Sequence, residues 1–101
     1  MTVTDLSRRI AAREAPAILD VRTEREFAGG HVPGAMNLPF DRIGARIGDS
    51  HLDRNAPLIV YCGHGPRAWI AARALRRAGF TVEYLKGHMA AWRRAGLPEE
   101  R

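Results

Sequence analysis

The stretch "IVYCGHGPRAWIAARAL", residues 59–75, joins an apolar run to a glycine-containing loop and then to a helical pattern. The run LIVY at 58–61 is uninterrupted, β-branched and aromatic, which predicts a strand buried on both faces. The helix begins at Pro66 or Arg67 and ends before Gly79, a residue suited to a left-handed helix end. A buried strand that leads into a helix is the repeating unit of a parallel sheet. The stretch therefore indicates an α/β fold.

The rest of the chain alternates in the same way. Further strands are predicted at Ala17–Val21, Ala35–Leu38 and Thr81–Leu85, and further helices at Thr4–Arg13, from Thr23 onward, at Phe40–Arg46 and at Met89–Ala95. Thr23 and Glu26 have the spacing of a capping box, which starts a helix. Strands separated by helices predict a mostly parallel sheet covered on both faces. With 101 residues and no linker, we expect one domain over residues 1–101.

The charge balance does not favour a nucleic-acid or membrane partner. The net charge is +5, but the basic residues are scattered, and Arg73, Arg76 and Arg77 share a helix with an apolar face made of Ile70, Ala71, Ala74, Leu75 and Ala78. We expect these arginines to form a solvated outer face. The start, MTVTDLSRR, lacks the apolar run of a signal peptide, which favours a cytoplasmic protein. The sequence has no long exposed apolar stripe that would require a subunit interface, so a monomer is expected.

The large aromatic residues are interpreted as core residues. Trp69, Trp92, Phe27 and Tyr61 are each expected to pack in or near the interior. The histidines have no partners at metal-ligand spacing, and His31 is expected to fix a turn. We therefore predict no metal site and no cofactor.

Cys62 is the only cysteine, so it cannot form an internal disulfide and is either inert packing or a lone nucleophile. It follows the strongest predicted strand, at the carboxyl edge of the sheet where ligands bind in open α/β folds. Gly63 and Gly65 leave room for backbone N–H groups to turn toward the sulfur and, with the helix dipole, favour its thiolate form. Arg67, five residues after the cysteine, adds a permanent positive charge that could close the loop or bind an anion.

The loop Cys62-Gly63-His64-Gly65-Pro66-Arg67-Ala68 resembles the active-site loop of the rhodanese, or sulfurtransferase, domain. Two further stretches agree in the right order: "LDVRTEREFAGGHVPGAMNLP" at 19–39 and "YLKGHMAAWRRAGLP" at 84–98. The resemblance implies a rhodanese-like three-layer α/β fold with a five-stranded, mostly parallel sheet. It also implies that Cys62 is the nucleophile and persulfide carrier and that the residues after it form the substrate-binding cradle.

Four loop and edge positions leave alternatives open. Pro66 has no N–H and either starts the helix or reduces the donors around the sulfur. His64 either assists substrate at the loop entrance or points to solvent. Asp20 and Arg22, at the same edge, are pocket or structural residues: Asp20 is expected to be held by an arginine, and Arg22 could attract an anionic donor. Glu26 fits a capping role only.

The leading hypothesis is transfer of sulfane sulfur from a small anion such as thiosulfate to a thiol or cyanide. The alternative is a sulfur relay with a partner protein and little small-molecule turnover. The intact Cys62 argues against a non-catalytic binding module, because an inactive copy needs no thiol in that loop. A phosphatase is disfavoured because the related cell-cycle phosphatases lengthen this loop by one residue, and arsenate reduction would need an external thiol.

Overall fold

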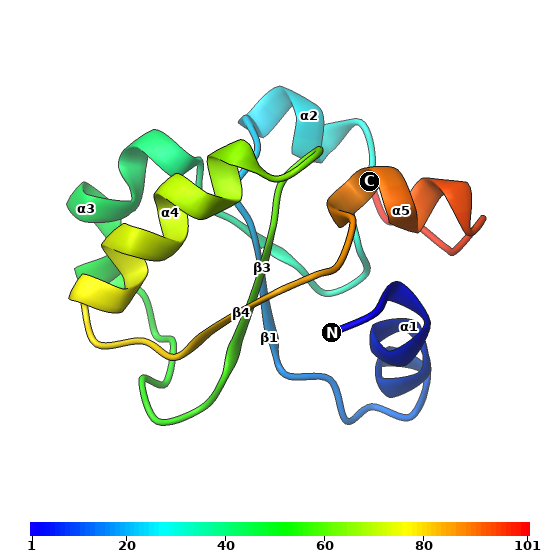
Figure 1. Cartoon of the computed structure of the whole chain (residues 1–101), viewed down its shortest axis with the longest axis horizontal. Coiled ribbons are helices and arrows are strands. Elements are labelled where there is room, and N and C mark those ends of the chain that lie inside the picture. The colour runs from blue at the N-terminus through cyan, green and yellow to red at the C-terminus, as the bar shows by residue number, and fades with distance from the viewer.

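The computed structural model describes residues 1–101 and contains a four-stranded parallel sheet (Figure 1). The strands are β1 (Ala17–Asp20), β2 (Met36–Asn37), β3 (Leu58–Tyr61) and β4 (Val82–Tyr84), in the order β2-β1-β3-β4. All three strand pairs are parallel, and the central pair aligns Ile18 with Ile59. The predicted α/β class is therefore confirmed, with β3 inside the sheet.

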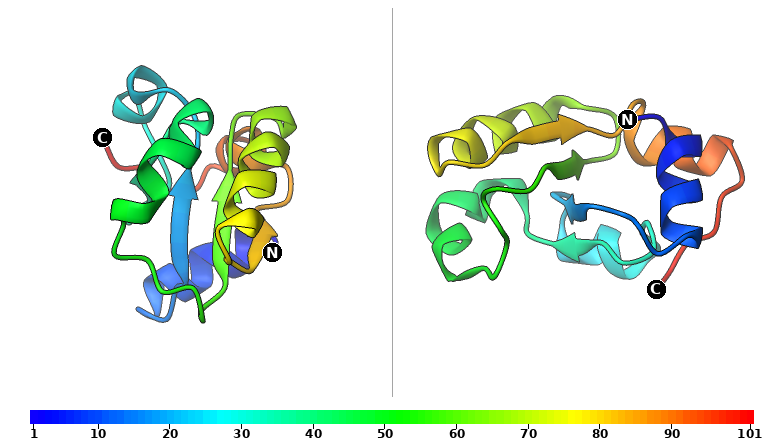
Figure 2. Two further views of the ribbon diagram at one scale, coloured as in Figure 1. Left: turned by 90° about the vertical axis from the view of Figure 1, so that its left-hand side faces the viewer. Right: turned by 90° about the horizontal axis from the view of Figure 1, so that it is seen from below.

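Helices cover both faces of this sheet. They are α1 (Val3–Ala11), α2 (Glu24–Ala28), α3 (Ile43–Arg46), α4 (Pro66–Arg77) and α5 (His88–Arg94), with short 3₁₀ segments η1 (Phe40–Arg42) and η2 (Ile47–Asp49). Figure 2 shows α3 and α4 on one side of the strands and α1 and α5 on the other. None of the helices has the length and hydrophobicity needed to cross a membrane.

Local sequence signals account for several element boundaries. Thr23 caps α2 with the reciprocal bonds of a capping box, in which Glu26 is the acidic partner. Pro66 occupies the first turn of α4, where its missing N–H costs nothing. Gly79 follows that helix with φ +96°, the left-handed conformation that glycine adopts without strain. These predicted signals are confirmed.

The sheet has four strands and not the five that were predicted, and only Met1 pairs with the outer side of β4. Its amino group donates to the carbonyl of Tyr84 at 3.0 Å, and Lys86 N–H donates to the Met1 carbonyl at 2.9 Å, so this residue continues the sheet beside β4. Thr2 is already the N-cap of α1, and the chain turns away at once. One paired residue does not make a strand, and the sheet has four.

Each face of the sheet has its own apolar core. On the α3–α4 side the core comprises Leu19, Val21, Ile43, Ile47, Leu58, Val60, Cys62, Ala68, Ala71, Leu75 and Phe80. On the α1–α5 side it comprises Leu6, Ile18, Val32, Ile59, Tyr61, Leu85, Met89 and Trp92. Alternate residues of β3 point to opposite cores, as strand geometry requires. This division fixes which face receives the side chain of Cys62.

One of the two predicted core tryptophans is on the surface. Trp92 is 1% exposed, whereas Trp69 is 58% exposed and the neighbouring Ile70 is 55% exposed. The sequence predicts that Ile70 belongs to the buried face of α4, but Ala68, Ala71 and Leu75 fill the contact with the sheet. Trp69 and Ile70 lie on the outer side of α4.

Candidate functional site

Cys62 lies directly after β3, and its side chain is fully buried on the α4 face of the sheet. The backbone N–H of Gly65 donates to the Cys62 Sγ at 3.0 Å. Gly65 has φ +136°, a conformation that side-chain-bearing residues rarely adopt, so a glycine is required to point this N–H at the sulfur. One backbone amide thus meets Sγ, where the sequence predicts several.

The loop passes directly into α4. Gly65 is the N-cap residue of the helix, its carbonyl accepts from Trp69 N–H at 3.1 Å, and Pro66 follows as the first helical residue. Ala68, in the first turn of α4, is fully buried, so its role here is close packing of the helix against the sheet. Sγ therefore lies beside the N-terminal turn of a twelve-residue helix, where the helix dipole favours negative charge.

Arg67 is bound to Glu26 of α2, which lies at the same end of the sheet as the start of α4 (Figure 1). Two hydrogen bonds join the guanidinium to the carboxylate, with Nη2 3.0 Å from Oε2. The Arg67 hydrogen bond, aided by bonds from Thr23, lowers the pKa of Glu26 to about 2. The pKa of Arg67 is raised in turn by Glu26. Glu26 therefore does more than cap α2, which is a role that the sequence did not predict.

Arg67 also lies close to the loop. A Cβ placed on Gly63 would be 3.2 Å from the Arg67 Nη2, tighter than an ordinary contact, so the absence of a side chain at Gly63 lets the guanidinium approach the backbone. The cation thus lies over the loop that follows Cys62 and is only partly covered.

Asp20 and Arg22 form a second ion pair, which is almost completely buried. Arg22 Nη2 donates to Asp20 Oδ2 at 2.7 Å and to the Gly30 carbonyl at 2.7 Å, and its guanidinium lies over the Tyr61 ring. Burial opposes the charged form of Arg22, but the hydrogen bond and charge of Asp20 outweigh it and raise its pKa. Arg22 therefore does not reach a pocket mouth, and its guanidinium ties β1 to the turn at Gly30.

The two loop-edge histidines differ in burial. His64 is exposed, while His88, the first residue of α5, is buried beside the loop. The Cys62 N–H donates to His88 Nδ1 at 3.2 Å. Sequence reasoning set His88 aside because it has no metal-ligand partner. The available signal was its position at the start of the helix that follows the last strand, at the same sheet edge as Cys62. No three His, Cys, Asp or Glu side chains gather as metal ligands would.

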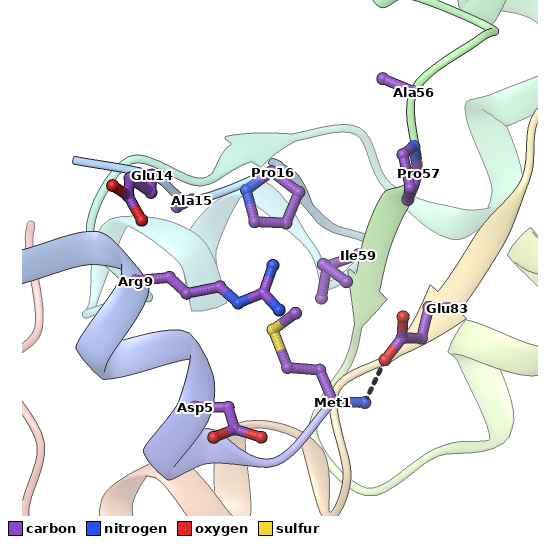
Figure 3. A pocket seen from close by; sticks show the side chains of 10 residues that line it. All are labelled: Met1, Asp5, Arg9, Glu14, Ala15, Pro16, Ala56, Pro57, Ile59 and Glu83. Carbon is purple, nitrogen blue, oxygen red and sulfur yellow. Dashed lines mark ion pairs between the residues drawn. The ribbon is translucent and has the colours of Figure 1, made fainter. Parts of the chain in front are cut away.

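A hollow of about 380 Å³ lies at the opposite edge of the sheet (Figure 3). Its lining includes Pro16 and Pro57, the residues that precede β1 and β3, together with Arg9 and Glu83. Ligands of open parallel sheets bind beyond the carboxyl ends of the strands, and this hollow is beyond the amino ends. It is therefore separate from the Cys62 loop.

Comparison with known proteins identifies relatives of the chain. Residues 2–95 match the family model described as "Rhodanese-like domain". The "Sulfurtransferase" of Allochromatium vinosum is 37% identical over 94 residues, which cover 92% of this chain and 86% of that protein. The "Thiosulfate sulfurtransferase GlpE" of Shewanella oneidensis is 39% identical over 79 residues, which cover 77% of this chain and 76% of that protein.

Solved structures agree in fold. The crystal structure of the Alr3790 protein from Anabaena sp. superposes with a TM-score of 0.88 at 34% identity, covering 99% of this chain and 90% of that one. This agreement extends over the whole described sheet and its helices, including the segment that carries Cys62.

Proposed function

Because the chain belongs to the rhodanese-like domain family, we propose that it is a sulfurtransferase that carries sulfane sulfur as a persulfide on Cys62. The observation that carries the proposal is the Gly65 N–H aimed at the Cys62 Sγ at 3.0 Å, at the carboxyl end of an interior strand. An amide donor and a helix N-terminus stabilise an anionic sulfur better than a neutral thiol. The curated relatives named as sulfurtransferases support the same chemistry.

The proposed reaction has two steps. The Cys62 thiolate attacks the outer sulfur of thiosulfate, so that a Cys62–S–S⁻ bond forms, the sulfur–sulfur bond of thiosulfate breaks, and sulfite leaves with the bonding electron pair. A nucleophilic acceptor such as cyanide then attacks the terminal sulfur, forms thiocyanate and regenerates the thiolate. Neither step requires a metal, an oxidant or a reductant.

Each loop residue has a role in this scheme. Gly63 leaves space for the Arg67 guanidinium, Gly65 supplies the amide that faces the sulfur, and Arg67 attracts the anionic donor. Pro66 starts α4, which keeps the helix terminus next to Sγ. His64 is exposed at the loop, where it is free to meet an incoming anion. The buried Cys62 requires the donor to enter through this loop, because helices and sheet enclose its other sides.

A protein-to-protein sulfur relay is the second candidate. The observation that favours it is the pair Trp69 and Ile70, large apolar side chains more than half exposed on the first turns of α4. Trp69 also packs near Gly65 of the loop. Exposed aromatic residues beside a reactive centre are typical contact residues for a protein partner, here one that carries the acceptor thiol.

Intact mass after incubation with thiosulfate tests the first proposal. The wild type is expected to gain one sulfur atom and to lose it again when cyanide is added. The matched variant Cys62→Ser, which changes one atom at the site, is expected to gain nothing. If the wild type gains no sulfur, or the variant gains it equally, the persulfide assignment fails.

The lifetime of the loaded form separates the two candidates. If the persulfide forms but persists in excess cyanide while a protein thiol removes it, the relay replaces the small-molecule reaction. In that case Trp69→Ser is expected to slow transfer to the protein thiol. Met36→Ser, which changes another exposed apolar side chain on β2, is the matched control and is expected to leave it unchanged.

A further inference from the structure

His88 adopts a backbone conformation that histidine rarely occupies. Its φ is +56°, in the left-handed region, and it directly follows Gly87, which is also left-handed with φ +73°. Only 6% of His88 is exposed. A left-handed residue other than glycine persists where surrounding contacts hold it in place. The contacts that hold the imidazole include two with the Cys62 loop, one at each side of the ring.

The hydrogen bond from Cys62 N–H determines the state of the imidazole. An N–H donor requires a lone pair on Nδ1, so the ring is neutral and carries its proton on Nε2. The same segment is held twice more by the start of α5, because Met89 N–H donates to the Cys62 carbonyl at 2.9 Å and Ala90 N–H to the Gly63 carbonyl at 3.2 Å. Three hydrogen bonds thus join α5 to the first two residues of the loop.

The other edge of the ring faces the end of the loop. A Cβ on Gly65 would be 3.4 Å from His88 Nε2, which places this nitrogen in contact range of the residue whose amide meets the sulfur. His88 therefore touches both sides of the turn, Cys62 through Nδ1 and Gly65 through the Nε2 edge.

We propose that His88 is a positioning residue: its neutral imidazole holds the Cys62–Gly65 turn in the geometry that directs the Gly65 amide at Sγ, and a proton on Nδ1 releases that turn. The proposal rests on the proposed function, since it concerns the same sulfur. Protonation consumes the Nδ1 lone pair and leaves two N–H groups facing each other across the Cys62–His88 contact. The hydrogen bond is then lost, and the turn is held by α5 backbone amides alone.

The surroundings of His88 favour the neutral ring. Burial lowers its pKa from the ordinary 6.5, and the nearby His64 lowers it further. The titratable groups around it include Cys62 and His64 on the loop and Tyr84 of β4, whose ring centroid is 6.2 Å away. Because the folded pKa of His88 lies below 6.5, the ordered turn is present at neutral pH and is lost as the pH falls through that lowered pKa.

Two substitutions separate the hydrogen bond from the backbone conformation. Asparagine tolerates left-handed φ and places its Oδ1 where Nδ1 lies, so His88→Asn keeps an acceptor that does not titrate. His88→Gly also tolerates the conformation but removes the acceptor. His51→Asn, at an exposed position far along the chain, is the matched control. All three variants avoid new backbone strain and are expected to fold.

The first measurement is the rate of persulfide formation with thiosulfate. At pH 7.5, His88→Gly is expected to be about tenfold slower than the wild type, and His88→Asn to recover most of the difference, as expected for one lost hydrogen bond. Below pH 6.5 the ratio of the His88→Asn rate to the wild-type rate is expected to rise, because only the wild-type ring can take up a proton at the contact with the Cys62 amide. Equal rates for the wild type and His88→Gly, or a constant ratio, would overturn the proposal.

The second measurement needs no activity. Nitrogen-15 NMR of the histidine rings is expected to show the Nε2–H tautomer for His88, and the Cys62 amide shift is expected to titrate with that ring in the wild type and to stay constant in His88→Asn. The positioning role is contradicted if His88 is the Nδ1–H tautomer at neutral pH. It is also contradicted if the Cys62 amide shift stays constant while the wild-type His88 ring titrates. If no protein gains sulfur, the proposed function fails and this titration still decides the role of His88.

Discussion

Two arginine–carboxylate pairs lie at the carboxyl edge of the sheet, and they differ in burial. The side chains of Arg22 and Asp20 are 3% and 0% exposed, whereas those of Arg67 and Glu26 are 30% and 37% exposed. Both pairs share bidentate geometry. Only the second pair flanks the Cys62 loop. The same chemical pairing therefore occurs in two environments within one small protein.

The difference in burial gives the two pairs different energetic properties. A buried charge without its partner is costly, so the pair between Asp20 and Arg22 cannot open without disturbing β1 and the turn at Gly30. The pair between Glu26 and Arg67 faces solvent on one side, where water replaces a lost partner at little cost. An incoming anion can therefore compete with Glu26 for Arg67. The buried pair is therefore structural, and the proposed role in attracting an anionic donor falls to the exposed pair.

The largest effect is expected from Arg22→Met. Removing this cation leaves the Asp20 carboxylate buried without its cationic partner and the Gly30 carbonyl with only the longer contact from Arg93 Nη2, at 3.5 Å. The free energy of unfolding should fall by about 3–5 kcal/mol, measured by urea denaturation. The double variant with Asp20→Asn removes the stranded charge and should recover part of the loss. Comparable stability of Arg22→Met and the wild type would show that the buried pair is not needed for the fold.

Replacing Arg67 with methionine should change the stability little and the KM for thiosulfate strongly. In Arg67→Met the free energy of unfolding should change by less than about 1 kcal/mol, because Glu26 remains solvated. The KM for thiosulfate should rise about tenfold, the value of one lost charge-assisted contact to the anion. Steady-state kinetics with sulfite release measure this effect. A large stability loss with an unchanged KM would show that Arg67 is a second structural arginine.

The smallest effect is expected from Glu26→Gln, which keeps the capping-box acceptor for the Thr23 amide but removes the charge. At pH 7 the variant should be less stable than the wild type by under about 1 kcal/mol. The folded pKa of Glu26 is about 2, below its ordinary 4.5, so the wild-type advantage is present above 4.5 and is lost as the pH falls toward 2. Thermal denaturation of both proteins across this range measures it, and a difference independent of pH would contradict the charge explanation.

Short-range sequence signals predicted the elements of this fold well. The apolar run at 58–61 is β3, the Thr23 capping box starts α2, and Pro66 and Gly79 bound α4 within a residue or two. Each signal acts through the backbone of its own segment, so the rest of the fold is not needed to read it. The position of Cys62 at the carboxyl end of a strand followed from the same reasoning.

The errors concern contacts between distant segments. Trp69 is exposed because other residues of α4 already fill the space over the sheet, and the sheet has four strands where five were expected. The ion pair between Glu26 and Arg67 joins residues 41 positions apart, and the bond between Cys62 and His88 joins residues 26 positions apart. Periodicity and capping signals within a segment do not identify a distant partner; for His88 the sequence indicates only that it lies at the same edge of the sheet as Cys62.

The sequence by itself determined the α/β alternation, the parallel sheet, and the glycine-flanked cysteine followed by an arginine, because periodicity, capping and turn preferences act locally. Only the tertiary structure decided which arginine is buried, which tryptophan is exposed, and that a left-handed histidine holds the amide of Cys62. Burial and hydrogen-bond partners depend on how separate elements pack. Identical residue types therefore receive different roles from their neighbours in space.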